Sequence, residues 1–140
     1  MFNKTPEIAV KNGICYLSED RKRYGLLLNK SVAENTVIAS LDKFSDFGFL
    51  NTRKINRQSE FYNCKLKTKT PSILQEVKSL SGGNQQKVIL ARWLLKNCDI
   101  FICRYFYSDS IKEIASFFQS NEAKIKNSLS EKSHWLYQAF

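Results

Sequence analysis

The chain has 140 residues, of which 43% are apolar, and its formal net charge at pH 7 is +9. This length predicts one domain, and the apolar fraction is sufficient for a hydrophobic core. No signal peptide and no run of about eighteen apolar residues is present, which excludes a membrane-spanning helix and predicts a cytoplasmic chain. The cysteines form no C-x-x-C pair, which favours free, buried thiols over metal ligands. They are Cys15, Cys64, Cys98 and Cys103.

The local sequence pattern predicts short strands and several helices. An apolar run from Ile14 to Leu17 predicts a strand, and residues 100–102 predict a second one. Ser31 and Glu34 have the spacing of a capping box, which marks the start of a helix. Predicted helices cover residues 32–41, 53–64, 83–95, 111–118 and 122–129.

The run from Leu80 to Lys87 reads Leu-Ser-Gly-Gly-Asn-Gln-Gln-Lys and is the most informative part of the chain. It places Ser81, Gly82 and Gly83 at the start of an apolar helix, where unpaired backbone N–H groups and partial positive charge attract anions. The glycines let a phosphate approach the backbone, and the serine can cap the helix and contact the ligand. A bare Ser-Gly-Gly is more typical of a flexible turn before a helix, so the longer run decides between these interpretations.

The longer run resembles the signature motif of ABC-transporter ATPases, in the form typical of ATP-binding subunits that import simple sugars such as ribose, galactose and xylose. Residues 13–26 read Gly-Ile-Cys-Tyr-Leu-Ser-Glu-Asp-Arg-Lys-Arg-Tyr-Gly-Leu and are similar to a second part of the same domain. The resemblance covers residues 11–100, which correspond to the middle of the family's second nucleotide-binding domain.

The resemblance implies a set of nucleotide contacts, because the family's signature motif acts in trans on ATP held by an opposing domain. The implied ATP-binding residues are Ser81, Gly82, Gly83 and Gln85, with Glu19 secondary in the loop that links ATP to the membrane subunit. The implied partners are an intact ABC ATPase domain and the membrane permease subunits of a sugar importer. Specificity for the sugar lies in other subunits, and the implied location is peripheral to the inner face of the cell membrane.

Two parts of the family's catalytic machinery are missing. None of the five glycines belongs to a G-x-x-x-x-G-K-[ST] run, the loop that holds phosphates and magnesium. After the strand at residues 100–102, Arg104 and Tyr105 occupy the place of the family's two carboxylates, and a cation and an aromatic ring hold no magnesium. We predict no catalytic residue, no metal ligand and no ATPase activity for the chain alone. ATP with magnesium is expected only on an intact partner domain.

These observations predict a mostly α fold with one or two short strands, as an incomplete fragment of an α/β P-loop ABC ATPase domain. Residues 1–100 form this partial domain, and residues 101–140 form a separate tail. The predicted function is that of a truncated ATP-binding subunit of a carbohydrate ABC importer, which contributes its signature motif to ATP binding in trans.

The tail supplies an alternative function. Parts of residues 101–129 resemble region four of bacterial sigma factors, which is a helix-turn-helix. Ser110 and Glu113 have capping-box spacing, and Ile111 and Ile114 begin an apolar helical face. This resemblance implies a DNA-binding, sigma-like interaction module, whereas residues 130–140 match neither family.

The charge distribution argues against DNA binding by the tail. Residues 104–140 carry five basic and four acidic side chains, a net charge of +1, whereas residues 1–103 carry a net charge of +8. Contacts to phosphates require excess positive charge, which the tail lacks. We therefore expect no promoter preference, and we interpret the basic residues elsewhere as solvated surface.

Overall fold

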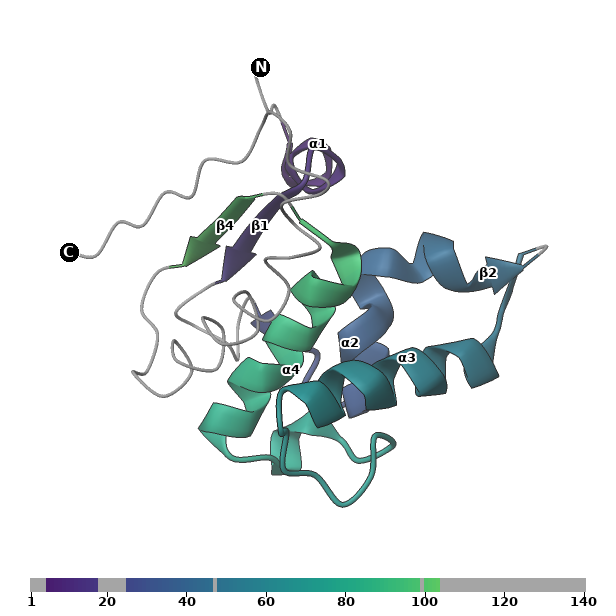
Figure 1. Ribbon diagram of the computed structural model, residues 1–140, viewed down its shortest axis with the longest axis vertical. Helices are drawn as coiled ribbons and strands as arrows, with labels where there is room; N and C mark the ends of the chain where they lie inside the picture. Colours follow the sequence, from purple (N-terminus) through teal and green to yellow (C-terminus); the bar gives the residue numbers. More distant parts are fainter. Residues whose placement is uncertain (1–4, 18–24, 47, 99, 104–140) are drawn as a thin grey trace. The chain divides into compact units, whose positions relative to one another are not determined.

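The computed structural model describes residues 5–17, 25–46, 48–98 and 100–103. Over these residues the chain is mostly helical with short strands, as predicted (Figure 1). It forms two compact units, of which one comprises Met1–Glu19 with Cys98–Phe140 and the other comprises Asp20–Asn97. Within the described ranges, every helix is too short or too polar to cross a membrane.

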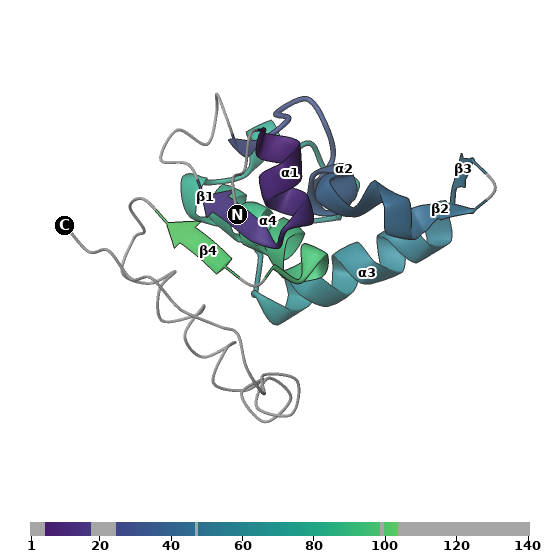
Figure 2. The ribbon, with the colours of Figure 1, turned by 90° about the horizontal axis from the view of Figure 1, so that it is seen from above.

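In its described residues, the first unit contains one short helix and a two-stranded parallel sheet. Helix α1 (Pro6–Lys11) begins at Thr5, whose Oγ1 accepts a hydrogen bond from the Ile8 N–H. Strand β1 (Ile14–Leu17) pairs with β4 (Ile100–Cys103), so that Ile14 lies opposite Ile100 (Figure 2). Parallel strands require a long crossover connection, and the second unit provides it. Both strands agree with the sequence prediction.

The prediction of free, buried thiols is wrong at three of the four cysteines. Cys15 in β1 and Cys98, just before β4, form a disulfide that spans 83 residues of sequence. Cys15 is fully buried, but Cys64 is free and exposed, which also differs from the predicted buried thiol. The pairing was not predictable from spacing, because the parallel register of β1 and β4 brings these distant positions together.

The second unit is built from three helices that pack against one another: α2 (Val32–Val37), α3 (Thr52–Lys65) and α4 (Gly82–Lys96) (Figure 1). The predicted ranges for α3 and α4 agree with these bounds to within one residue at each end. A cluster of buried apolar side chains joins the three helices, and burial of such side chains provides most of the favourable free energy of folding. Its members are Ala33, Val37, Phe44, Ile55 and Leu95.

Helix α2 is shorter than the predicted 32–41. It passes into the 3-10 helix η2 (Ile38–Phe44), with a kink at Ser40. The Asn35 carbonyl, near the end of α2, accepts a 2.7 Å hydrogen bond from Nε of Arg92. The change of helix type thus lies beside a tertiary hydrogen bond.

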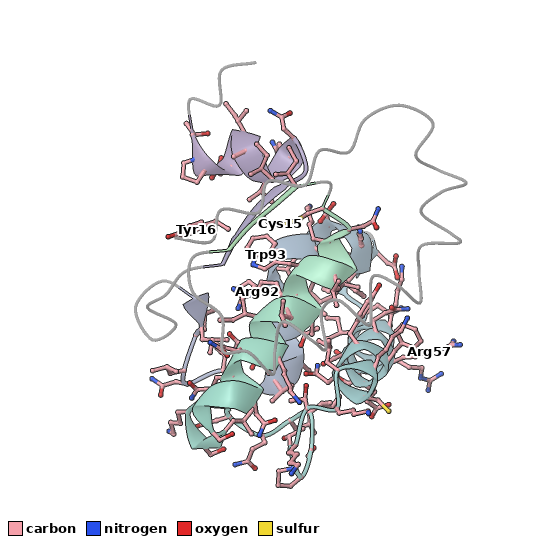
Figure 3. All side chains as sticks on the ribbon, turned by 60° about the vertical axis from the view of Figure 1, so that its left-hand side comes forward. Cys15, Tyr16, Arg57, Arg92 and Trp93 are labelled. Carbon is pink, nitrogen blue, oxygen red and sulfur yellow. A yellow bond between two sulfur atoms is a disulfide. The ribbon has the colours of Figure 1, made fainter. Side chains whose placement is uncertain are left out.

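Arg92, which is labelled on α4 in Figure 3, forms a buried polar network with Asn35 in this unit. The Arg92 guanidinium donates to the Asn35 carbonyl and side-chain oxygens and, at 2.7 Å, to the Gly25 carbonyl. The Asn35 side chain also bonds the Leu27 N–H and carbonyl at 2.9 Å each. Burial lowers the pKa of Arg92 to about 10, and these hydrogen bonds offset the cost of desolvating its charge.

A small hairpin and a short 3-10 turn complete the second unit. Strands β2 (Ser45–Asp46) and β3 (Phe49–Leu50) pair antiparallel, and Gly48 between them has a φ of 86°, a conformation that favours glycine. The hairpin was not predicted, because strands of two residues are too short to show an alternating pattern. The turn η3 (Val77–Ser79) lies directly before the signature run.

The predicted tail lies almost entirely outside the described residues. Of residues 101–140, the structure describes only the backbone of 101–103, as the end of β4. The helix-turn-helix and the boundary at residue 100 therefore stay predictions.

Candidate functional site

The signature run forms the N-terminus of α4, where the sequence predicts an anion site. Ser81 is the N-cap residue, with φ −61° and ψ 155°, and its backbone carbonyl accepts the first helical hydrogen bond from Gln85 at 2.9 Å. The Ser81 side chain does not cap the helix, and the first turn contains no acidic residue. The first turn of α4 therefore supplies no carboxylate of its own to the positive end of the helix dipole.

The Ser81 hydroxyl is oriented by the side chain of Asn84. The Oδ1 atom of Asn84 accepts a hydrogen bond from the Lys69 backbone N–H at 2.9 Å, and its Nδ2 atom donates to Ser81 Oγ at 2.9 Å. A backbone N–H can only donate, so it fixes the orientation of the Asn84 amide. Ser81 Oγ must then act as the acceptor in this contact. Its own proton points elsewhere and can be donated to an anion.

Gly83 has no side chain although the fold tolerates one. A Cβ atom built on Gly83 has no heavy atom within 4 Å, and its φ lies outside the left-handed region. A glycine within a helix costs about 0.5–1 kcal/mol relative to alanine. The space beside Gly83 is thus kept open at some cost in helix stability, as expected where a ligand approaches the backbone.

Lysines surround the same helix end. Lys87 Nζ donates to the Lys67 carbonyl at 3.2 Å, which ties α4 to the loop that also carries Lys69. Lys67 itself has a φ of 51°, an uncommon conformation for a residue with a side chain. The loop at 67–69 thus contacts α4 near its start, and the Lys87 ammonium adds positive charge there.

The structure separates Gln85 from the other predicted contacts. Gln85 is only 5% exposed, and its Nε2 atom donates to the Val77 carbonyl at 3.1 Å, which anchors η3 to α4. A nucleotide contact by Gln85 stays a prediction that requires this hydrogen bond to break. Ser81, Gly82 and Gly83 are adjacent at the helix end.

Sequence reasoning missed Asn84, which touches Ser81 directly. The available signal was its position three residues after an N-cap serine, where a polar side chain can reach back to the cap. Glu19 lies outside the described residues, so its prediction is untested. In the described part of the chain, no group of three His, Cys, Asp or Glu side chains could hold a metal ion.

No protein-family model matches the chain. Individual proteins do match it. A ribose/galactose/methyl galactoside import ATP-binding protein of Halalkalibacterium halodurans is 54% identical over 97 residues, which are 69% of this chain and 19% of the relative. The xylose import ATP-binding protein of Thermoanaerobacter pseudethanolicus is 47% identical over 70% of this chain, again 19% of the relative.

A third relative is the ribose import ATP-binding protein of Clostridium perfringens, 47% identical over 67% of this chain and 19% of its own length. The chain thus spans about a fifth of the sugar-import proteins that it matches. Their names agree with the resemblance carried by residues 11–100. The sigma-like resemblance of the tail gains no support from them.

Proposed function

We propose that this chain contributes a signature motif to ATP bound by an intact sugar-import ATP-binding subunit. The chain is homologous to part of such subunits, at 47–54% identity in the relatives named above. In this proposal the backbone at Gly82 and Gly83 and the hydroxyl of Ser81 contact the terminal phosphate. The partner subunit supplies the phosphate-binding loop.

One observation carries this proposal, namely the open space at Gly83 beside Ser81, whose side chain makes no cap hydrogen bond at the start of α4. A triphosphate fits this arrangement because it is an anion that accepts hydrogen bonds from backbone N–H groups and from a hydroxyl. The Asn84 contact directs the Ser81 proton away from Asn84, which leaves it for donation to a phosphate oxygen. Adjacent lysines on α4 and in the loop at 67–69 favour the same charge.

The chain alone would not hydrolyse ATP. When bound to the partner subunit, ATP with magnesium supplies the reactive phosphoryl group, and catalysis depends on positioning that metal and phosphate. The residues of this chain that we assign to the site donate hydrogen bonds, and none of them is a carboxylate or a base. The complex would lie on the cytoplasmic side of the membrane, together with the permease subunits of the importer.

The test is ATP-dependent association of the full chain with the ribose import ATP-binding protein of Clostridium perfringens, a relative at 47% identity. Isothermal titration with ATP and magnesium, with ADP and magnesium, and without nucleotide measures it. We expect a complex with ATP only, abolished by Gly82→Asp because a carboxylate would lie against phosphate.

The control is Asn56→Asp, which adds the same charge on α3 and should leave the complex intact. Association that is indifferent to nucleotide and to Gly82→Asp would overturn the proposal. Magnesium-dependent phosphate release by the purified chain alone, if Ser81→Arg abolishes it, would overturn the statement that the chain alone does not hydrolyse ATP.

A further inference from the structure

Helix α3 presents a surface that combines basic and large apolar side chains. Arg53, Arg57, Phe61 and Lys65 follow one another at intervals of four residues, so they share one face of the helix. At about 1.5 Å per residue, this stripe extends over about 18 Å. All four residues are exposed, and Arg57 projects away from the ribbon in Figure 3.

The β2–β3 hairpin extends this stripe with apolar side chains. Phe49 is 81% exposed and Leu50 is 53% exposed, and Asn51, the N-cap of α3, follows them directly. Phe61 on α3 is 55% exposed. We call the six residues Phe49, Leu50, Arg53, Arg57, Phe61 and Lys65 the α3 surface. Single exposed apolar residues are ordinary, but several together beside arginines mark an interaction site.

The two arginines of the α3 surface are available for a partner of opposite charge. Neither Arg53 nor Arg57 forms an ion pair with a described carboxylate. The Lys65 ammonium lies 5.6 Å from the centre of the Phe61 ring. By contrast, Lys54 on the adjacent face donates to the Lys43 carbonyl at 2.8 Å. Two exposed acidic groups are close in sequence, Glu60 on α3 and Asp46 in the hairpin, and neither belongs to the stripe of Arg53, Arg57, Phe61 and Lys65.

We propose that the α3 surface binds an anionic lipid surface. Interfacial membrane segments combine basic side chains, which attract anionic headgroups, with aromatic and aliphatic side chains that enter the headgroup region. A nucleic-acid duplex would pair with the two arginines but, with its bases stacked inside, would leave Phe49 and Leu50 exposed. A lipid surface satisfies both kinds of side chain at once. The proposal is independent of the signature site, because the α3 surface shares no residue with it.

The experiment measures partition of the full chain into vesicles of phosphatidylcholine with 30% phosphatidylglycerol, a composition chosen for the test, and into pure phosphatidylcholine vesicles. We expect binding to the anionic vesicles only. Arg53→Gln with Arg57→Gln should weaken it about twentyfold, since each basic residue near such a surface contributes about fivefold. Phe49→Ser should weaken it about fivefold through lost apolar burial.

The charge-matched control is Lys30→Gln with Lys78→Gln, which removes two exposed lysines outside the α3 surface. It should change partition less than threefold. Equal weakening by both double variants would overturn the proposal, as would strong binding to pure phosphatidylcholine. If Phe49→Ser partitions like the original chain and duplex DNA displaces the chain fully from the anionic vesicles, the α3 surface binds polyanions in general, and the proposal of a lipid surface is overturned. Thermal melts of every variant separate these outcomes from unfolding.

Discussion

Helices α2 and α4 both begin at a serine, and the two serines have nearly the same backbone conformation, with φ and ψ of −66° and 164° at Ser31 and −61° and 155° at Ser81. At α2, Ser31 Oγ accepts from the Glu34 N–H at 3.1 Å, and Glu34 Oε2 accepts from the Ser31 N–H at 2.8 Å. At α4, Ser81 Oγ accepts from the Asn84 side chain instead.

The difference lies in the residue three positions after the cap. Glu34 returns to the backbone of Ser31 and adds negative charge to the first turn, so the start of α2 is internally satisfied. Asn84 is neutral and bonds the serine hydroxyl, and the Ser81 side chain does not cap α4. The same cap residue therefore stabilises the fold in one helix, and in our proposal contacts a ligand in the other.

The largest effect is expected inside α2, where the polar network is structural. Asn35→Leu removes the acceptor of Arg92 Nη2 and the partners of the Leu27 backbone, and leaves a buried guanidinium with fewer hydrogen bonds. We expect a loss of about 3 kcal/mol in the free energy of unfolding. Urea unfolding measures it, with Asn56→Leu on α3 as the control. Equal stability of both variants would show that the network contributes little.

The next effect concerns binding at α4. In Asn84→Asp both side-chain oxygens are acceptors, so the Ser81 proton would turn toward the new carboxylate. ATP-dependent association with the intact subunit should weaken at least about tenfold, which corresponds to 1.4 kcal/mol. In the Ser81→Ala background the same substitution should cost less, because the hydroxyl is absent. If Asn84→Asp weakens the association equally with and without the Ser81 hydroxyl, the added charge causes the loss, and the Ser81 proton plays no part in it.

Exchange of the two cap serines for alanine should separate stability from binding. Ser31→Ala should lower the free energy of unfolding by about 1 kcal/mol through the lost cap. Ser81→Ala, whose side chain caps no backbone group, should change stability by less than half of that. Chemical unfolding measures the stability of the two variants, and titration with the intact subunit measures their binding. Equal destabilisation by both substitutions would show that the two serines do not differ in how they stabilise their helices.

The smallest effect depends on pH. Hydrogen bonds from the Ser31 backbone and side chain lower the pKa of Glu34 below its ordinary 4.5. Its contribution to stability is therefore complete above pH 4.5 and is lost as the pH falls through the lower pKa of the folded state. We expect Glu34→Gln to cost about 0.5 kcal/mol near pH 7 and less at pH 3. If Glu34→Gln lowers the free energy of unfolding equally at pH 7 and at pH 3, the charge of Glu34 does not have the role assigned to it.

Local sequence predicted the parts of this fold that depend on local interactions. Strand β1 and the capping box at Ser31 and Glu34 agree with the structure, because apolar pattern and capping involve residues close together in the chain. The kink at Ser40 did not follow from such signals. It accompanies a hydrogen bond from Arg92 to Asn35, which are 57 residues apart.

The candidate site likewise combines features that local sequence predicts with features that depend on distant contacts. Its motif placed Ser81, Gly82 and Gly83 at the start of a helix, and the structure has α4 begin at Gly82. The burial of Gln85 and the contact of Asn84 with the Lys69 backbone depend on how η3 and the preceding loop pack onto α4. Periodicity along α4 alone contains no information about these neighbours.

The central claim is that the start of α4 is kept open for a ligand at the expense of stability. Gly83→Ala tests it most directly, because the added Cβ has no atom within 4 Å in the protein. We predict that this variant unfolds with a free energy higher by about 0.5–1 kcal/mol, while its ATP-dependent association with the ribose import ATP-binding protein weakens. A variant that is more stable and binds as tightly as the original chain would contradict the claim.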